Sequence, residues 1–200
     1  MPTQMKKNIL LIAIIFSAAG ALQAQKYTSV TYSIGFPSGD LLDYIGKTSW
    51  RGINIDYKNL INPNVGIGFS VGWNVFYEEL AKDTYTLDNI SVTGKQYRYS
   101  NHVPIFVNAN YYLKPEEDKC PFFGFGIGTI YTARNTDMNL YTYKLEAWNF
   151  AIQPEIGMKY EMNPDMALSI SGRYTHGFQA GEIDTPQSYF SLNIGFIFIK

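Results

Sequence analysis

The chain has 200 residues with 17 acidic and 16 basic side chains, so its formal net charge is −1. A nearly neutral chain without a basic run argues against a nucleic-acid partner. Charged residues make up 16% of the chain, below the ~25% usual in soluble domains, whereas Tyr and Phe number 16 and 13. This composition indicates that something other than water covers part of the surface.

Residues 1–24 have the pattern of a cleaved secretory signal peptide. Two lysines precede an apolar run at 9–16, and the small residues that follow allow cleavage after Ala21 or after Ala24. The run is too short for the roughly 20 apolar residues that a spanning helix needs. Cleavage would remove two lysines and no acid, which leaves residues 25–200 with a formal charge of −3. We expect this mature part to form one domain.

Apolar and polar residues alternate at period two in eight segments, which is the pattern of strands with two unlike faces. In the clearest segment, Val, Ile, Phe, Val, Trp and Val at odd positions alternate with Gly, Ser and Asn. No long stretch shows apolar residues at helical spacing. The eight segments are 27–36, 53–58, 65–75, 103–112, 123–131, 150–159, 168–174 and 190–198.

The links between these segments alternate in length. Short links rich in Pro and Asn follow the second, fourth and sixth segments, and longer polar links follow the others. The short links are 60–64, 114–121 and 161–165, and the long ones are 37–49, 77–102, 134–148 and 177–187. Outer-membrane barrels have short periplasmic turns and long outer loops. An even number of strands places both ends of the chain on the short side.

The polar face of the strands decides which face lies inside. A soluble, lipocalin-like barrel would show the same period with its apolar face inward. Here the polar face is mainly Gly, Ser, Asn, Thr and Ala, whereas a water-exposed surface carries roughly a quarter to a third charged residues. Closure also leaves no strand edge unpaired in lipid. We therefore expect an all-β fold, an eight-stranded antiparallel transmembrane β-barrel of up-and-down topology.

Aromatic residues near the strand ends are expected to form girdles at the two membrane–water interfaces. The girdle candidates are Tyr27, Trp50, Tyr77, Tyr131, Trp148, Tyr160 and Tyr174.

Three segments resemble known small barrels. The C-terminal stretch 189–198 is similar to the aromatic closing strand that the barrel-assembly machinery reads, although Ile199 and Lys200 follow the last Phe. Segments 122–128 (FFGFGIG) and 154–160 (PEIGMKY) resemble the small outer-membrane β-barrel families around OmpA, OmpX and OmpW, as in Bacteroidetes-type bacteria.

The resemblance covers the mature chain. It implies a multi-pass protein of the Gram-negative cell outer membrane, with lipopolysaccharide outside and phospholipid inside. Such families contain adhesins, structural barrels, small porin-like channels and many proteins of unknown role, so the resemblance specifies architecture and not chemistry.

Five charged side chains fall on the inward face of the predicted strands: Asp56, Lys58, Glu155, Lys159 and Arg173. A turn that pairs Tyr160 with Met166 would set the register between the sixth and seventh predicted strands. In that register Glu155 lies opposite Ser171 and diagonal to Arg173. Because a bare charge in a packed interior is costly, we expect a salt-bridge network that fills the lumen. A gate or proton-conducting plug is the alternative, since eight strands leave no room for a water-filled pore.

The two histidines, His102 and His176, are the candidate catalytic residues in the sequence. Ser100 with His102 is a nucleophile–base pair of the kind that lipid A-modifying barrels use, but no third member is evident. Two histidines without a third ligand make no metal site, and the lone Cys120 allows no intrachain disulfide. We expect no enzyme activity, no metal and no cofactor.

The long links carry tyrosines in alternating patterns. Segments 84–86 and 96–99 predict a hairpin that extends beyond the bilayer around Asp88-Asn89. Exposed Tyr-rich strands bind partners through aromatic contacts and edge pairing, although a girdle that continues into an ordinary loop is the alternative. The candidate loop residues are Tyr85, Tyr97, Arg98, Tyr141 and Tyr143.

Three functions follow from these features. The first is a structural or surface-interaction role, such as adhesion, in which a monomer presents four extracellular loops to an outside ligand. The second is a narrow channel or carrier for small, apolar solutes. The third is a lipid A-modifying enzyme.

Overall fold

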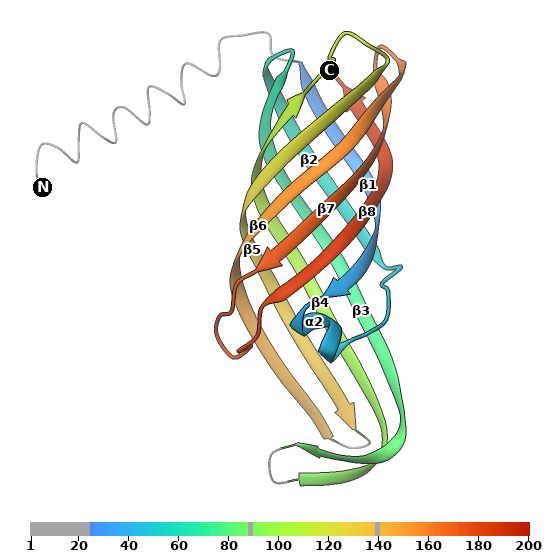
Figure 1. Cartoon of the computed structure of the whole chain (residues 1–200), viewed down its shortest axis with the longest axis vertical. Coiled ribbons are helices and arrows are strands. Elements are labelled where there is room, and N and C mark those ends of the chain that lie inside the picture. Colours follow the sequence, from blue (N-terminus) through green and yellow to red (C-terminus); the bar gives the residue numbers. More distant parts are fainter. Residues whose placement is uncertain (1–24, 88–89, 139–140) are drawn as a thin grey trace, which may run out of the picture.

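The computed structural model describes residues 25–87, 90–138 and 141–200, which form an eight-stranded barrel. The strands are β1 (Lys26–Ser38), β2 (Gly52–Asn62), β3 (Val65–Leu87), β4 (Ile90–Tyr112), β5 (Lys119–Met138), β6 (Tyr141–Asn163), β7 (Met166–Gly177) and β8 (Gln187–Ile199), and a short helix, α2 (Asp40–Tyr44), follows β1. Neighbours in the chain pair antiparallel, and β1 pairs with β8 to close the barrel (Figure 1). The expected fold class is confirmed.

Residues 1–24, where a signal peptide is predicted, lie outside the described part of the chain, so this cleavage stays a prediction. Within the described ranges, no helix is both long and apolar enough to cross a membrane.

The two faces of the strands divide as the alternation predicts. On β1, Ser33 is fully buried, whereas its neighbour Tyr32 is 45% exposed on the outer wall. Large apolar side chains cover this wall on every strand, among them Ile156 at 71% and Val107 at 65% exposed. An outer wall of this kind suits a hydrocarbon environment, because water would leave so large an apolar surface unfavourably hydrated.

One of the predicted girdle residues is wrong. Tyr27 points inward, is 6% exposed and packs edge-to-face against Tyr112 with ring centroids 5.7 Å apart. Its position on the same face as Ser29 already requires this, because residues two apart on a strand share a face. Trp50 and Trp148, at 65% and 60% exposed, do lie on the outer wall.

Both ends of the described chain and the three short turns lie at one end of the barrel, which we call the turn end (Figure 1). The Lys26 amide donates to the Lys200 carbonyl over 2.7 Å, which ties the first strand to the C-terminus. The turns after β2 and β6 contain two residues each, and a register shift precedes each turn. The short links at this end are confirmed.

The opposite end, which we call the hairpin end, differs from the prediction. The links expected at 77–102 and 134–148 are wrong as loops, because β3–β4 and β5–β6 continue pairing there as two long hairpins (Figure 1). The strand character of 84–86 and 96–99 is confirmed, while the predicted tip at Asp88-Asn89 lies outside the described residues. Polar residues such as Gln96, Arg134 and Thr136 occupy the buried face of these extensions, so apolar residues in the sequence do not mark that face.

Two prolines interrupt the hydrogen-bond ladders of the wall. The Phe178 amide donates to the Phe150 carbonyl, so the even-numbered residues of β6 direct their backbone groups toward β7. Pro154 occupies such a position and has no N–H to give, and no pairing joins residues 153–154 to β7. The same argument applies to Pro104 on β4, where pairing with residues 72–73 of β3 is missing. These two sites are local gaps in an otherwise continuous ladder.

Candidate functional site

A cluster of four charged side chains crosses the middle of the lumen. The Arg173 Nε lies 2.9 Å from Glu155 Oε1, and its Nη2 lies 2.9 and 3.0 Å from the two carboxylate oxygens of Asp56. Lys58 Nζ is 3.9 Å from the other oxygen of Glu155. All four residues are at most 8% exposed. Two acids and two bases make the cluster formally neutral, which is the condition for burying charge in a packed interior.

Two neutral donors complete the cluster. Ser29 Oγ donates to Asp56 Oδ2 over 3.1 Å, and Asn110 Nδ2 donates to Glu155 Oε2 over 3.2 Å. The members come from β1, β2, β4, β6 and β7, so they connect opposite walls of the barrel.

The predicted register between β6 and β7 is wrong by two residues. Glu155 pairs directly with Arg173, not with Ser171. The reason is the two-residue turn, in which Asn163 pairs with Met166, and the register shift that precedes it. A shift of two keeps every side chain on its face, so the inward direction of both residues is unaffected.

Lys159 is not part of this cluster. Its Nζ lies 3.4 Å from the Tyr27 hydroxyl and 3.3 Å from Glu161 Oε2, closer to the turn end. The structure therefore brings four of the five predicted interior charges together and gives the fifth its own partners.

Apolar side chains close the lumen on either side of the charges. A layer at the turn end contains Tyr27, Leu60, Tyr112, Cys120, Phe122, Ala167, Ile197 and Ile199. A smaller group of Phe106, Ile130 and Ala151 packs inside the wall farther along. Since every one of these side chains is at most 6% exposed, the interior of an eight-stranded barrel is filled by its own residues.

Helix α2 caps the hairpin end. Leu41 and Ile45, one helical turn apart, are fully buried against Phe76 and Tyr189 of the wall. The sequence pattern does not predict this helix, because five residues are too few to show a helical period. The spacing of Leu41 and Ile45 is the signal that could have indicated it.

Two arginines hold the cap in place. The guanidinium carbons of Arg98 and Arg134 lie 5.2 and 4.5 Å from the ring centroid of Tyr44, and Arg98 Nη1 donates to the Tyr44 carbonyl over 2.8 Å. Burial raises the pKa of the Tyr44 phenol, whose hydroxyl lies 2.7 Å from Thr136 Oγ1. Arg98, a predicted loop contact, is thus engaged with the cap, and the role of Arg134 was not foreseen.

The Ser100 and His102 side chains lie beneath this cap. Ser100 Oγ and His102 Nε2 are 2.8 Å apart, but both residues are fully buried. His102 packs against the rings of Phe76 and Tyr189, and its Nδ1 faces no hydrogen-bond partner among the described residues. A base in this pair would lack the third group that orients it. In the described ranges, no three His, Cys, Asp or Glu side chains gather as metal ligands.

The four central strands extend past the other strands as an open sheet, which we call the protruding sheet: residues 77–87 of β3, 90–101 of β4, 132–138 of β5 and 141–148 of β6. At its base, Arg98, Arg134 and Thr136 contact the α2 cap. The predicted loop tyrosines lie here but do not converge. Tyr141 and Tyr143 share one face at 57% and 45% exposed, and Tyr97 pairs with Asp137 on the other face. The Tyr85 hydroxyl bonds to the Ala81 carbonyl of its own strand.

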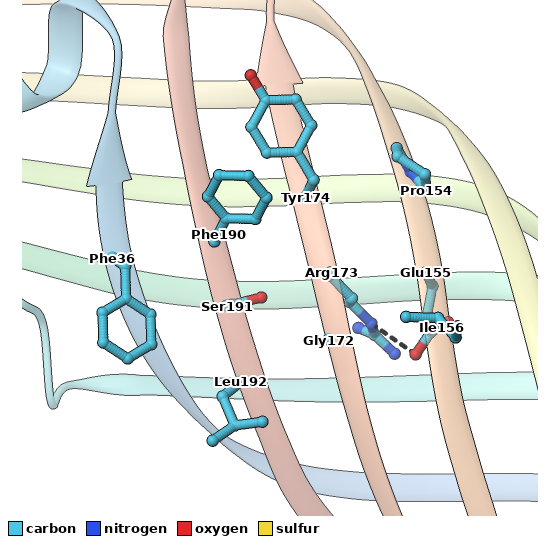
Figure 2. Close-up of a pocket in the computed structure, with 10 residues that line it drawn as sticks. All are labelled: Phe36, Pro154, Glu155, Ile156, Gly172, Arg173, Tyr174, Phe190, Ser191 and Leu192. Carbon is cyan, nitrogen blue, oxygen red and sulfur yellow. Dashed lines mark hydrogen bonds and ion pairs between the residues drawn. The ribbon is translucent and has the colours of Figure 1, made fainter.

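A cleft of about 430 Å³ opens on the outer wall at the gap beside Pro154 (Figure 2). Gly172 leaves the cleft open, since a Cβ placed there would meet no atom within 4 Å. Apolar side chains such as Ile156 surround its mouth, and the Arg173–Glu155 pair lies at its floor (Figure 2). The cleft can hold an apolar group close to buried charge. The proline within a strand was the sequence signal for it.

The comparisons with known proteins agree with this architecture. The outer membrane protein beta-barrel domain family matches residues 9–198. Ail, the attachment invasion locus protein of Yersinia pestis, has a similar structure, with 9% identity, a TM-score of 0.53, and 88% of this chain and 97% of that chain covered.

The outer membrane protein OprG of Pseudomonas aeruginosa is also similar, at 12% identity and a TM-score of 0.55, with 91% of this chain and 98% of that one covered. No curated protein matches the sequence significantly. The family match spans nearly the whole chain. The chain therefore belongs to the outer membrane protein beta-barrel domain family and is an integral protein of the outer membrane.

Proposed function

We propose that this protein is a closed surface scaffold whose protruding sheet binds an extended segment of a partner protein by strand addition. The orientation usual in this class of barrel places short turns in the periplasm and the hairpin end outside the cell. The lumen is filled by apolar layers and a neutral charge cluster, so the accessible chemistry lies on the protruding sheet.

The observation that carries the proposal is the free edge of β3. Pairing of β3 with β2 ends where Asn74 meets Gly52, while pairing with β4 continues to Leu87. Odd-numbered β3 residues direct their backbone groups away from β4, as the bond from the Val75 amide to the Arg51 carbonyl shows. The Tyr77 and Glu79 amides thus face a side with no strand partner in the described ranges. An open edge of this kind is a template for another strand.

The charge of the hairpin end favours a protein over a sulfated glycan. A structure of Ail holds the heparin analogue sucrose octasulfate. In this chain the four long links and the adjoining Arg51 carry ten acidic and seven basic residues. A polyanion would therefore meet net repulsion at this end.

Peptide selection tests the proposal. A display library of random 12-residue peptides is selected against the full barrel in nanodiscs, and the peptides are then measured on two variants. Glu79→Pro removes an edge amide that β4 does not use, and we expect at least a tenfold loss of affinity. Glu79→Gln keeps the amide and loses only the charge, so it should bind as the wild type does.

Equal binding of the selected peptides to Glu79→Pro and wild type would contradict strand addition. A selection that returns no peptide would contradict it as well. Heat-modifiable migration on gels checks that each variant is folded.

The wall cleft favours a second candidate, a carrier of small apolar solutes. Gly172→Leu should fill the cleft without a clash, because nothing lies within 4 Å of a Cβ at this position. We expect wild-type barrels to bind the apolar dye N-phenyl-1-naphthylamine and Gly172→Leu to lose this binding. Ala109→Leu places the same leucine side chain elsewhere on the exposed wall and is the control. Equal dye binding by all three proteins removes this candidate.

The proposal includes no catalysis. Ser100 and His102 are the nucleophile and base that the sequence offers, and both lie buried under the α2 cap. Solvent and lipid would reach them only after α2 left the barrel mouth. Unchanged lipid A masses in cells with and without His102→Ala would agree with this view, and an altered profile would contradict it.

A further inference from the structure

A second groove on the outer wall lies at the hairpin end of the apolar belt. Its volume is about 480 Å³, and its lining includes Tyr32, Arg51, Ile53, Trp73, Val75 and Asn101. One lining residue, Trp73, lies at the gap where residues 72–73 of β3 have no pairing with β4, but Pro104 itself does not line the groove. The groove spans four neighbouring strands of the outer wall, from Tyr32 on β1 to Asn101 on β4.

Arg51 is the one cation that lines this groove. It is exposed, and within the described ranges no carboxylate lies at ion-pair distance from its guanidinium. Five other basic groups of the described chain do have a carboxylate partner: Lys58, Lys95, Lys114, Lys159 and Arg173. An unpaired arginine beside an apolar surface can form charge-assisted bonds to an anion from outside the chain.

The backbone around Arg51 is firmly placed. The Val75 amide donates to the Arg51 carbonyl over 2.9 Å, and the Arg51 amide donates to Ser49 Oγ over 3.2 Å. The Tyr32 hydroxyl bonds to the neighbouring Trp50 carbonyl. These three hydrogen bonds fix the position of the Arg51 backbone. The side chain therefore loses less conformational entropy when a ligand binds.

The level of the groove corresponds to the boundary between hydrocarbon and headgroups. Lipid-facing β3 residues are apolar through Trp73, which is 54% exposed, and Val75, and then change to Tyr77 and Glu79. Trp50, at 65% exposed, adds a second indole at this level. Indole rings mark the interface in membrane proteins. A ligand here would place acyl chains over Ile53 and Trp73 and an anionic head at Arg51.

We propose that this groove binds a phosphorylated glycolipid of the outer leaflet, with a phosphate on Arg51 and an acyl chain over Trp73. The outer leaflet of this membrane supplies lipid A, which joins phosphates directly to an acylated sugar. The inference is independent of the partner of the protruding sheet and needs only that the hairpin end faces outward.

Native mass spectrometry of the full barrel in neutral glucoside micelles tests the site. Diphosphorylated lipid A is titrated against wild type, Arg51→Gln and Lys82→Gln. Lys82 is an exposed hairpin cation away from the groove, so its variant controls for the change in net charge. We expect Arg51→Gln to bind about tenfold more weakly and Lys82→Gln to bind as the wild type does.

Two further lipids test whether the groove recognises the phosphate, the acylated sugar or both. Dephosphorylated lipid A should bind wild type and Arg51→Gln with equal, low affinity. Phosphatidylglycerol, which has a phosphate but no acylated sugar, should bind more weakly than lipid A. Equal affinity of wild type and Arg51→Gln for diphosphorylated lipid A overturns the site, and phosphatidylglycerol binding as tight as lipid A overturns the glycolipid assignment.

Discussion

Arg173 is the residue on which the interior charge cluster depends. Its guanidinium contacts both carboxylates, Asp56 and Glu155, at 2.9 Å, whereas Lys58 reaches only one of them at 3.9 Å. Removal of Arg173 would leave two buried carboxylates with one distant cation. The cost is then that of an uncompensated buried charge, which exceeds the loss of one attractive contact.

We expect Arg173→Met to lower the free energy of unfolding by about 3–5 kcal/mol, the typical cost of removing one partner from a buried ion pair. Urea unfolding in lipid vesicles, followed by tryptophan fluorescence, measures this change. The variant Arg173→Met with Asp56→Asn leaves Lys58 opposite Glu155 and should recover most of the loss. A single-variant loss below about 1 kcal/mol would show that the cluster does not couple the walls.

The strands behave as elements with two unlike parts. Within the apolar belt, one face meets lipid and the other the filled lumen, so period two marks them clearly. In the protruding sheet, polar residues such as Gln96, Ser100 and Thr136 lie on the buried face, so period two no longer separates apolar from polar residues. Prolines further divide the belt, because Pro104 and Pro154 each remove the amide that the neighbouring strand would accept. The wall cleft coincides with the interruption at Pro154, whereas Pro104 does not line the groove at Arg51.

Pro154→Ala should restore one ladder bond from β6 to the Tyr174 carbonyl. A backbone bond gained in this way stabilises by about 1 kcal/mol. Hydrogen exchange in the β6–β7 region should slow, and exchange at the distant β3–β4 gap should not change. Unaltered exchange at both sites would mean that the missing proline N–H is not the cause of the gap.

At the scale of the whole molecule, the sequence predicts the barrel but not the contacts between the side chains that fill its lumen. Alternation predicts strand faces, because any register consistent with a buried interior preserves them. It does not predict the partner of Glu155, since a two-residue turn with a register shift moves the pairing without moving a face. The sequence does not predict the α2 cap either, because the burial of Leu41 and Ile45 depends on side chains from distant strands.

The same difference in scale separates the proposed sites. Glu155 and Arg173 are recognisable in the sequence as inward charges, but the contact of Arg173 with both Glu155 and Asp56 requires three strands in the correct order. The lining of the Arg51 groove comes from four strands, so it follows from their order and register and not from any one segment of the sequence.

The central claim is that the barrel is closed and acts through its outer surface. Single-channel recording of the folded full-length barrel in planar bilayers tests it most directly. The apolar layers and the charge cluster predict a baseline current without steps, for wild type and for Tyr44→Ala, in which the α2 cap is loosened but the deeper layers remain. Discrete, reproducible conductance steps from the folded wild-type protein would contradict the account.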